Sequence, residues 1–148
     1  MIEALIDTNV AVAILVDGHM NHNSSFALLG AGEQQIAIAA HSYAEAYNTL
    51  TRKNGVLAYP PDQAWAALEH LRRFTVLLGL TPTQTLEGIR AYAQSSGIGP
   101  RLYDRLIGEV AVVHGIPAIV TWNVGHMRSL FPALTVVTPA EWLEDGKG

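Results

Sequence analysis

The sequence contains no cysteine, which excludes disulfide bonds and metal sites built on thiolates. Any metal that the protein binds must therefore be held by oxygen or imidazole ligands. A chain without cysteine is compatible with a reducing compartment, and we expect a cytoplasmic protein.

A long apolar run and a basic leader are also missing. The apolar stretch 10–16 follows Asp7 and Asn9 rather than a basic segment and ends at Asp17, unlike a secretory signal peptide. No run approaches the roughly 18 apolar residues that a membrane-spanning helix needs. We therefore expect no membrane association, and the hydrophobic residues, 49% of the total, are assigned to a core and to a subunit interface.

Basic residues are not in excess. Lysine and arginine number 9 against 13 aspartate and glutamate residues, and the formal net charge is −4. This balance argues against a protein that binds nucleic acid by bulk electrostatic attraction alone. It does not exclude an acidic site that reaches phosphate groups through bound cations.

The 148 residues predict a single domain over 1–148, in which strand-like and helix-like segments alternate. Strands are expected at 2–6, 35–39, 74–78, 116–121 and 134–137. Helices are expected at 10–16, 23–29, 42–53, 60–73, 83–94, 102–114 and 139–143. Residues 123–129 are interpreted as a loop or a short helical turn, and the polar tail 144–148 is expected to fray.

This alternation predicts an α/β fold of three layers, with helices on both faces of a central five-stranded, mostly parallel sheet. Parallel strands follow one another through right-handed crossovers, so their carboxyl ends meet at one edge. Ligand sites of such sheets lie at that edge. The search for functional residues therefore starts where the predicted strands end.

Four polar residues fall at or near this edge. Asp7 ends the first strand, and Glu45 and Asp104 lie in first turns of helices next to the second and fourth strands. Asn123 follows the fourth strand by two residues. Clustered carboxylates repel one another unless a cation lies between them, and Mg²⁺ prefers such oxygen ligands. We expect Asp7 and Asp104 to bind the metal directly and Glu45 to bind a metal-bound water or to orient the nucleophile.

Each of these residues also has an ordinary structural explanation, which the sequence leaves open. Asp7 can cap the following helix, and Glu45 with Ser42 fits a Ser-x-x-Glu capping box. Asp104 can complement a helix dipole, and Asn123 is common in turns. These structural explanations are less convincing for all four residues together than for each alone, because all four are predicted at the same edge.

The neighbours of these residues provide secondary candidates. Arg101 and Arg105 flank Asp104 and are the candidates for contact with phosphate. His126 is near enough to contact phosphate or water, although a solvated loop is the commoner setting for such a histidine. Gly108 is expected to leave room above the carboxylate of Asp104.

Two further groups are given ordinary assignments. His19 and His22 are interpreted as loop residues, because no third metal ligand follows at a recognisable interval. The three tryptophans are assigned to the core or an interface, with Trp122 as the one to test for base stacking.

Four segments together resemble the PIN-domain proteins, and among them the VapC-like toxins of toxin–antitoxin pairs. The segments are Leu-Ile-Asp-Thr-Asn at 5–9, Ser-Tyr-Ala-Glu at 42–45, Tyr-Asp-Arg-Leu-Ile at 103–107 and Ile-Val-Thr-Trp-Asn-Val-Gly-His-Met at 119–127. They occur in the family's order and cover nearly the whole chain. The resemblance implies a sheet in the order 3-2-1-4-5 and a homodimeric endoribonuclease that depends on Mg²⁺ or Mn²⁺ and is inhibited by a small antitoxin.

The resemblance also assigns residues. Asp7, Glu45 and Asp104 match the family's acidic positions, and Thr121 matches the hydroxyl that supports the site. Asn123 stands where many members carry a fourth aspartate, which lowers the negative charge and leaves the number of metal ions open. Thr8 and Asn9 belong to the first motif and are taken, with His126, as supporting residues.

Three functions are therefore compared. The first is a toxin that cuts RNA, with the carboxylates as its catalytic residues. The second is a catalytically weak module that binds RNA or protein, which the asparagine at 123 and the acidic net charge favour. The third is another metal-dependent phosphodiesterase, such as a DNA nuclease. The sequence does not indicate which RNA would be cut, which face would form the dimer or which antitoxin would bind.

Overall fold

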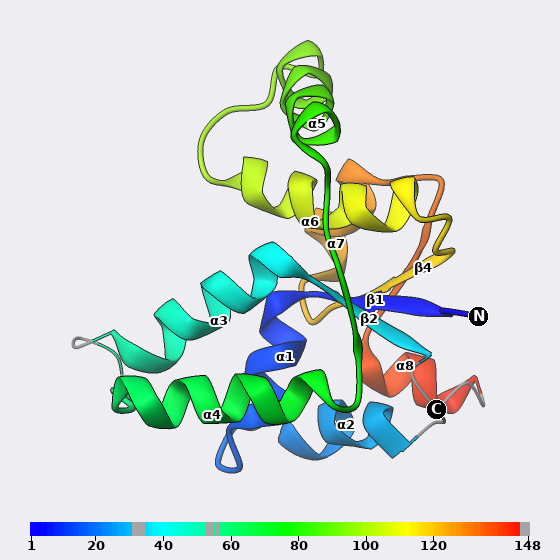
Figure 1. The fold of residues 1–148 in the computed structure, drawn as a ribbon. Coiled ribbons are helices and arrows are strands. Elements are labelled where there is room, and N and C mark those ends of the chain that lie inside the picture. The colour runs from blue at the N-terminus through cyan, green and yellow to red at the C-terminus, as the bar shows by residue number, and fades with distance from the viewer. Residues whose placement is uncertain (31–34, 53–54, 56, 146–148) are drawn as a thin grey trace.

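The computed structural model describes residues 1–30, 35–52, 55 and 57–145. Figure 1 shows a sheet with helices around it. The strands are β1 (Ala4–Ile6), β2 (Ile36–Ala39), β3 (Val76–Leu78), β4 (Ala118–Val120) and β5 (Thr135–Val137). The α-helices are α1 (Thr8–Leu15), α2 (His22–Ala27), α3 (Ala40–Thr51), α4 (Pro61–Arg72), α5 (Pro82–Gln94), α6 (Arg101–Val113), α7 (Val124–Leu130) and α8 (Pro139–Glu144), and a 3₁₀ turn, η1, spans Leu28–Gly30.

The five strands pair in the order β3-β2-β1-β4-β5, and every pairing is parallel. In the centre, Leu5 of β1 is in register with Ala37 of β2 and Ile119 of β4. The three central strands are fully buried, as expected of parallel strands covered on both faces. The predicted α/β fold and the order 3-2-1-4-5 are confirmed.

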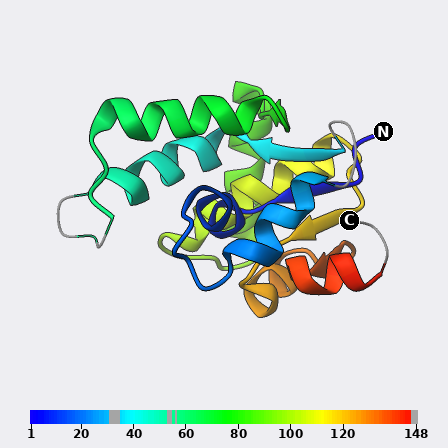
Figure 2. The same ribbon diagram turned by 90° about the horizontal axis from the view of Figure 1, so that it is seen from below.

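Alternate residues of the strands enter two hydrophobic cores, one on each face of the sheet. On one face, Ile6, Ile38 and Val120 pack with residues of α1 and with Trp142 of α8. On the other face, Leu5 and Ile119 pack with residues of α6 and α7. Figure 2 shows these layers from below, with α2 and α8 on one side of the strands.

Helices α3 and α4 lie beside each other beyond the sheet (Figure 1). A third hydrophobic cluster joins them to α1 and includes Val12, Leu50 and Leu68. Since α3 starts directly after β2, this cluster sets the direction in which α3 leaves the sheet. Among the described helices, none is both long and apolar enough to cross a membrane.

Several predicted boundaries differ from the observed ones. Helix α3 begins at Ala40 rather than at Ser42, and the segment 123–129 contains a true helix, α7. The third strand is shorter than predicted, since residues 74 and 75 precede it. The last residue of the helix predicted at 42–53 and residues 146–148 of the tail lie outside the described residues.

Gly108 has a different role from the predicted one. A Cβ atom at this position would lie 2.1 Å from the Phe131 ring, so the glycine lets α7 and its following residue approach α6. The guanidinium of Arg105 lies 5.0 Å from the centroid of the same ring, on which it stacks. The prediction that Gly108 leaves room above Asp104 was therefore wrong, because the buried Phe131 ring lies against the glycine.

We expect Gly108→Ala to lower the free energy of unfolding by about 1–3 kcal/mol, because the buried Phe131 ring must move to admit the methyl group. Gly125→Ala in α7 is the matched control, since its Cβ would meet nothing within 4 Å. Urea denaturation of both variants measures the difference. Equal stability of Gly108→Ala and the wild-type protein would contradict this account of the packing.

Candidate active site

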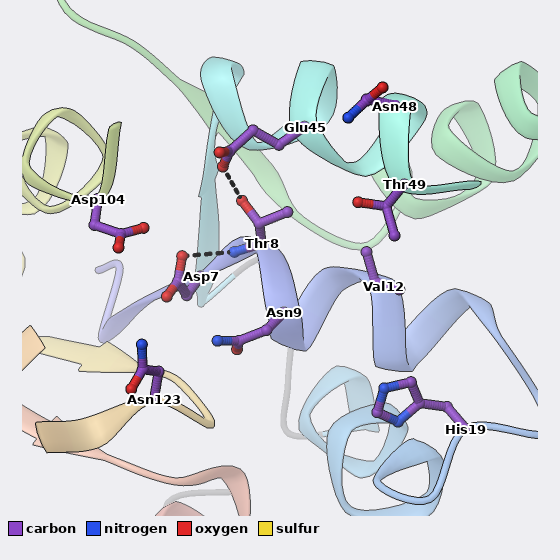
Figure 3. Close-up of a pocket in the computed structure, with 10 residues that line it drawn as sticks. All are labelled: Asp7, Thr8, Asn9, Val12, His19, Glu45, Asn48, Thr49, Asp104 and Asn123. Atoms are coloured by element: carbon purple, nitrogen blue, oxygen red, sulfur yellow. Dashed lines mark hydrogen bonds between the residues drawn. The ribbon is translucent and has the colours of Figure 1, made fainter. Parts of the chain in front are cut away.

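The four residues predicted at the sheet edge line one pocket of about 380 Å³. Asp7 follows β1 directly, and Asn123 lies just before α7 at the end of β4. Glu45 comes from α3 and Asp104 from α6, so four separate chain segments contribute. In Figure 3, the side chains of Asp7, Glu45, Asp104 and Asn123 surround a common space.

Asp7 is the most buried carboxylate of the pocket, with 5% of its surface exposed. Its Oδ1 accepts a hydrogen bond from the backbone N–H of Thr8 at 2.8 Å, so the residue does cap α1. Its Oδ2 accepts one from the hydroxyl of Thr121 at 2.9 Å. Capping and site geometry are therefore compatible at Asp7, because these bonds fix the carboxylate at the pocket wall.

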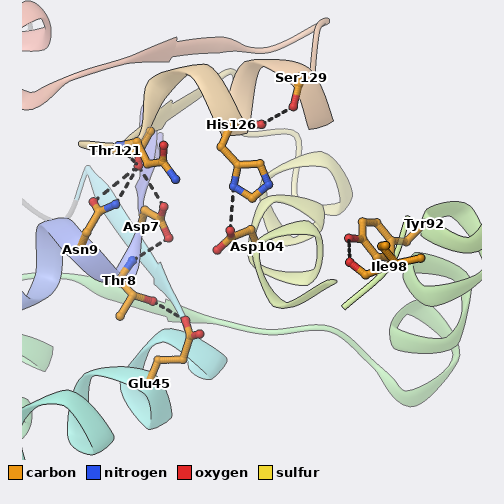
Figure 4. Close-up of polar contacts among 11 residues, drawn as sticks. Asp7, Thr8, Asn9, Glu45, Tyr92, Ile98, Asp104, Thr121, His126 and Ser129 are labelled. Carbon is orange, nitrogen blue, oxygen red and sulfur yellow. Dashed lines mark hydrogen bonds and ion pairs between the residues drawn. The ribbon is translucent and has the colours of Figure 1, made fainter. Parts of the chain in front are cut away.

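Thr121 organises the polar base of the site, and it is fully buried. While its hydroxyl donates to Asp7, the same oxygen accepts from the Asn9 amide at 3.2 Å and from the Asn123 backbone N–H at 3.0 Å. Asn9 in turn accepts from the Trp122 N–H at 3.0 Å. Figure 4 shows how this network ties the end of β1 to the end of β4.

Glu45 does not form the capping box that the sequence suggested. Helix α3 starts five residues before it, and the Ser42 side chain is buried inside the helix rather than at its cap. The Oε1 atom of Glu45 instead accepts a hydrogen bond from the Thr8 hydroxyl at 2.7 Å. This bond crosses from α3 to the first turn of α1 and directs the carboxylate into the pocket.

Asp104 is held by a histidine. Its Oδ2 lies 2.9 Å from Nδ1 of His126, which α7 provides (Figure 4). The His126 side chain is only 9% exposed, whereas that of Asp104 is 31% exposed. The loop interpretation of His126 was therefore wrong. The histidine is a buried helical residue whose ring N–H donates to the carboxylate.

The surroundings of the site raise the pKa values of two of its carboxylates, Asp7 and Asp104. The pKa of Asp7 is raised to about 6, mainly by burial and less by the negative charges of Asp104 and Glu45, against the two hydrogen bonds that lower it. Burial is also the main reason why the pKa of Asp104 is raised, although His126 opposes this shift. Both shifts have the sign expected where like charges share a partly desolvated space.

These features fit a hard divalent cation. A cation would offset both the burial of these carboxylates and the smaller repulsion between them, and the available donors are the oxygens that Mg²⁺ and Mn²⁺ prefer. In the described part of the chain, no three His, Asp or Glu side chains are already close enough to chelate an ion together. Mg²⁺ commonly uses only one or two carboxylates and keeps several waters in its shell.

The two arginines beside Asp104 differ from each other. Arg105 forms an ion pair with Glu109 at 3.0 Å and stacks on Phe131, so its guanidinium is engaged in packing. Arg101 is exposed at the start of α6, and its charge lowers the pKa of Asp104. Of the two, only Arg101 retains an exposed side chain for contact with phosphate.

Part of the pocket wall was not predicted from the sequence. Asn48 and Thr49 of α3 and His19 of the loop before α2 line the side opposite Asp104 (Figure 3). The helical spacing from Glu45 to Asn48 and Thr49, three and four residues, was the available signal. No local pattern marked His19, whose position depends on how the loop folds back over α1.

The raised pKa of Asp7 predicts a variant that is more stable than the wild-type protein. The folded state binds the Asp7 proton more tightly than the unfolded state, so stability is lost as the pH rises from 3.8 through about 6. Two pKa units correspond to about 3 kcal/mol. In metal-free buffer, Asp7→Asn should therefore exceed the wild-type stability above pH 6 by up to that amount and match it below pH 4.

Urea denaturation at several pH values measures this effect. Asp62→Asn, at an exposed position of α4, is the matched control and should follow the wild-type pH dependence. A variant Asp7→Asn that is less stable than the wild-type protein at pH 8 would contradict the electrostatic account.

Comparison with known proteins gives three findings. The family model described as PIN domain matches residues 4–125. Ribonuclease VapC27 of Mycobacterium tuberculosis is 32% identical over 109 residues, which are 74% of this chain and 77% of the relative. The family match spans all four pocket residues.

Solved structures share the fold. VapC20 of Mycobacterium tuberculosis, a toxin that cleaves the Sarcin-Ricin loop, superposes with a TM-score of 0.68 and 15% identity, over 86% of this chain and 95% of VapC20. DNA-bound VapBC from Salmonella typhimurium gives a TM-score of 0.65 and 19% identity, over 94% and 99% of the two chains. With its five parallel strands and a family match over most of its length, this chain belongs to the PIN-domain family.

Proposed function

We propose that this protein is a metal-dependent endoribonuclease that acts as the toxin of a toxin–antitoxin pair. The observation that carries the proposal is the meeting of Asp7, Glu45 and Asp104 in one open pocket. The relative VapC27, which is named a ribonuclease, supports RNA as the substrate. Cleavage would hydrolyse a phosphodiester bond of RNA in the cytoplasm.

Mg²⁺, with Mn²⁺ as a substitute, is the proposed cofactor, and Asp7 and Asp104 are its proposed ligands. When bound, such an ion supplies positive charge to the phosphate and lowers the pKa of a coordinated water. The chain itself contributes fixed geometry. Thr8 and Thr121 hold the Asp7 oxygens, and His126 holds Asp104, so neither carboxylate needs to reorganise before it binds the ion.

Glu45 and Asn123 have different proposed roles in the same pocket. The Oε1 atom of Glu45 accepts a hydrogen bond from Thr8, while its Oε2 atom makes no hydrogen bond among the described residues and lies 4.0 Å from Nε2 of His41. We propose that this oxygen accepts a proton from the attacking water. The neutral side chain of Asn123 adds no charge, so the site carries three carboxylates and is proposed to work with one tightly bound ion.

The proposed partners follow from the relatives. Several similar structures are described as VapBC or toxin–antitoxin complexes, among them VapBC2 from Rickettsia felis and a complex from Klebsiella pneumoniae. We therefore propose a small antitoxin protein and a homodimer for this chain. A reading frame for a small DNA-binding protein beside the gene would support the first, and sedimentation of the purified protein tests the second.

The three carboxylates should each be needed for RNA cleavage. We expect Asp7→Ala, Glu45→Gln and Asp104→Asn each to lower the rate of Mg²⁺-dependent cleavage more than about a hundredfold, because each removes charge that holds the ion or the water. Gel analysis of total cellular RNA incubated with antitoxin-free protein measures the rate. Glu87→Gln on α5 removes an equally charged side chain that is 64% exposed and should cleave as the wild-type protein does.

The outcomes separate the three functions. Metal-dependent cleavage of DNA but not RNA would indicate another phosphodiesterase. RNA binding without metal, unaffected by Asp104→Asn, would indicate a binding module. A purified, antitoxin-free protein that cuts no cellular RNA at any Mg²⁺ or Mn²⁺ concentration would overturn the proposal.

His126 should control metal affinity through Asp104. We expect His126→Ala to weaken Mn²⁺ binding about 10- to 100-fold, the usual effect of removing a hydrogen-bond partner from a metal ligand. His126→Gln can still donate an N–H and should recover part of the affinity. Calorimetric titration with Mn²⁺ measures both variants, and an unchanged dissociation constant in His126→Ala would contradict this role.

A further inference from the structure

Two aromatic rings stack between the helices that carry Glu45 and Asp104. The rings of His41 and Tyr103 have centroids 5.1 Å apart and an interplanar angle of 13°. Both are partly accessible, since the His41 side chain is 40% exposed and Tyr103 is 45% exposed. A stacked pair that remains this accessible does not bury its apolar area in a core.

The pair lies within one helical turn of both carboxylates. His41 precedes Glu45 by four residues on α3, and its Nε2 lies 4.0 Å from Oε2 of Glu45. Tyr103 is the residue before Asp104 on α6. A nucleotide whose phosphate reaches these carboxylates therefore brings its base close to one of the two rings.

Positive charge beside the pocket is a weak source of RNA affinity. The net charge is −4, three carboxylates line the pocket, and Arg105 is engaged with Glu109, which leaves Arg101 as the exposed one of the two arginines beside Asp104. Trp122, the tryptophan nearest the site, donates its ring N–H to Ser25 and packs against the first core. Stacking of bases on aromatic rings gives affinity that does not depend on positive charge.

We propose that His41 and Tyr103 form a base-stacking platform that holds an unpaired nucleotide next to the scissile phosphate. The inference rests on the proposed function for the identity of the ligand as RNA. An exposed ring face accepts only a base that is out of its helix, so the platform selects single-stranded or looped RNA over duplex RNA. Its role is to position the substrate, and it takes no part in bond cleavage.

The test compares binding and cleavage. Binding is measured by fluorescence anisotropy with an end-labelled single-stranded RNA decamer, in an Asp7→Ala background that does not cut it. Adding Tyr103→Ala or His41→Ala should weaken binding roughly tenfold, while Tyr103→Phe keeps the ring and the affinity. In otherwise wild-type protein, Tyr103→Ala should raise KM for RNA by a similar factor with little change in kcat.

Two controls separate a platform from a structural contact between α3 and α6. Trp65→Ala removes a ring that is 54% exposed on α4 and should leave RNA affinity unchanged. A duplex RNA of the same sequence should bind the ring variants as tightly as it binds the unsubstituted protein. If Tyr103→Ala lowers kcat and thermal stability but not RNA affinity, the pair is a structural contact and the inference is wrong.

The result is independent of the proposed catalytic activity. Ring-dependent binding of RNA that is never cut would support the platform and overturn the nuclease. If the protein cleaves RNA but the ring variants bind RNA as tightly as their parent does, the nuclease is supported and the platform is overturned. Absence of measurable RNA binding in the Asp7→Ala protein, with or without Tyr103, would also overturn the platform.

Discussion

The structure depends on one unfavourable interaction, the meeting of like-charged carboxylates at the edge of a parallel sheet. The pKa of Asp7 is raised to about 6, mainly by burial at this edge and in addition by its acidic neighbours. The fold tolerates this because Thr8 and Thr121 donate to Asp7 while His126 donates to Asp104. Because the metal-free site is electrostatically unfavourable, binding of a cation there would stabilise the folded protein. The lower stability of the metal-free protein is thus linked to the proposed chemistry of the site.

The supporting network also explains why the polar residues around the site are difficult to exchange. Thr121 takes part in hydrogen bonds to Asp7, Asn9 and the backbone of Asn123, so one buried hydroxyl connects the ends of β1 and β4. A buried group with this many partners leaves several of them unsatisfied when it is removed. At Asp7, the proposed function lowers the stability of the folded protein. At Thr121, the same hydrogen bonds support both the site and the stability of the fold.

Much of the fold followed from the sequence, because apolar segments of strand length alternate with amphipathic helices and leave few topologies. The approach of Asp7, Glu45 and Asp104 followed from the rule that parallel strands end at one edge. Features that depend on tertiary packing did not follow. The Phe131 ring over Gly108, the burial of His126 and the stacking of His41 on Tyr103 join segments distant in sequence, and no local pattern reports them.

The central claim is that one divalent cation binds between Asp7 and Asp104. Crystals grown with Mn²⁺ and measured near the manganese absorption edge test it most directly, because anomalous scattering locates the ion without reference to activity. The account predicts a peak within about 2.0–2.3 Å of an oxygen from each carboxylate, the range for small hard cations. Ordered crystals at saturating Mn²⁺ with no peak in this pocket, or with a peak only elsewhere, would contradict it.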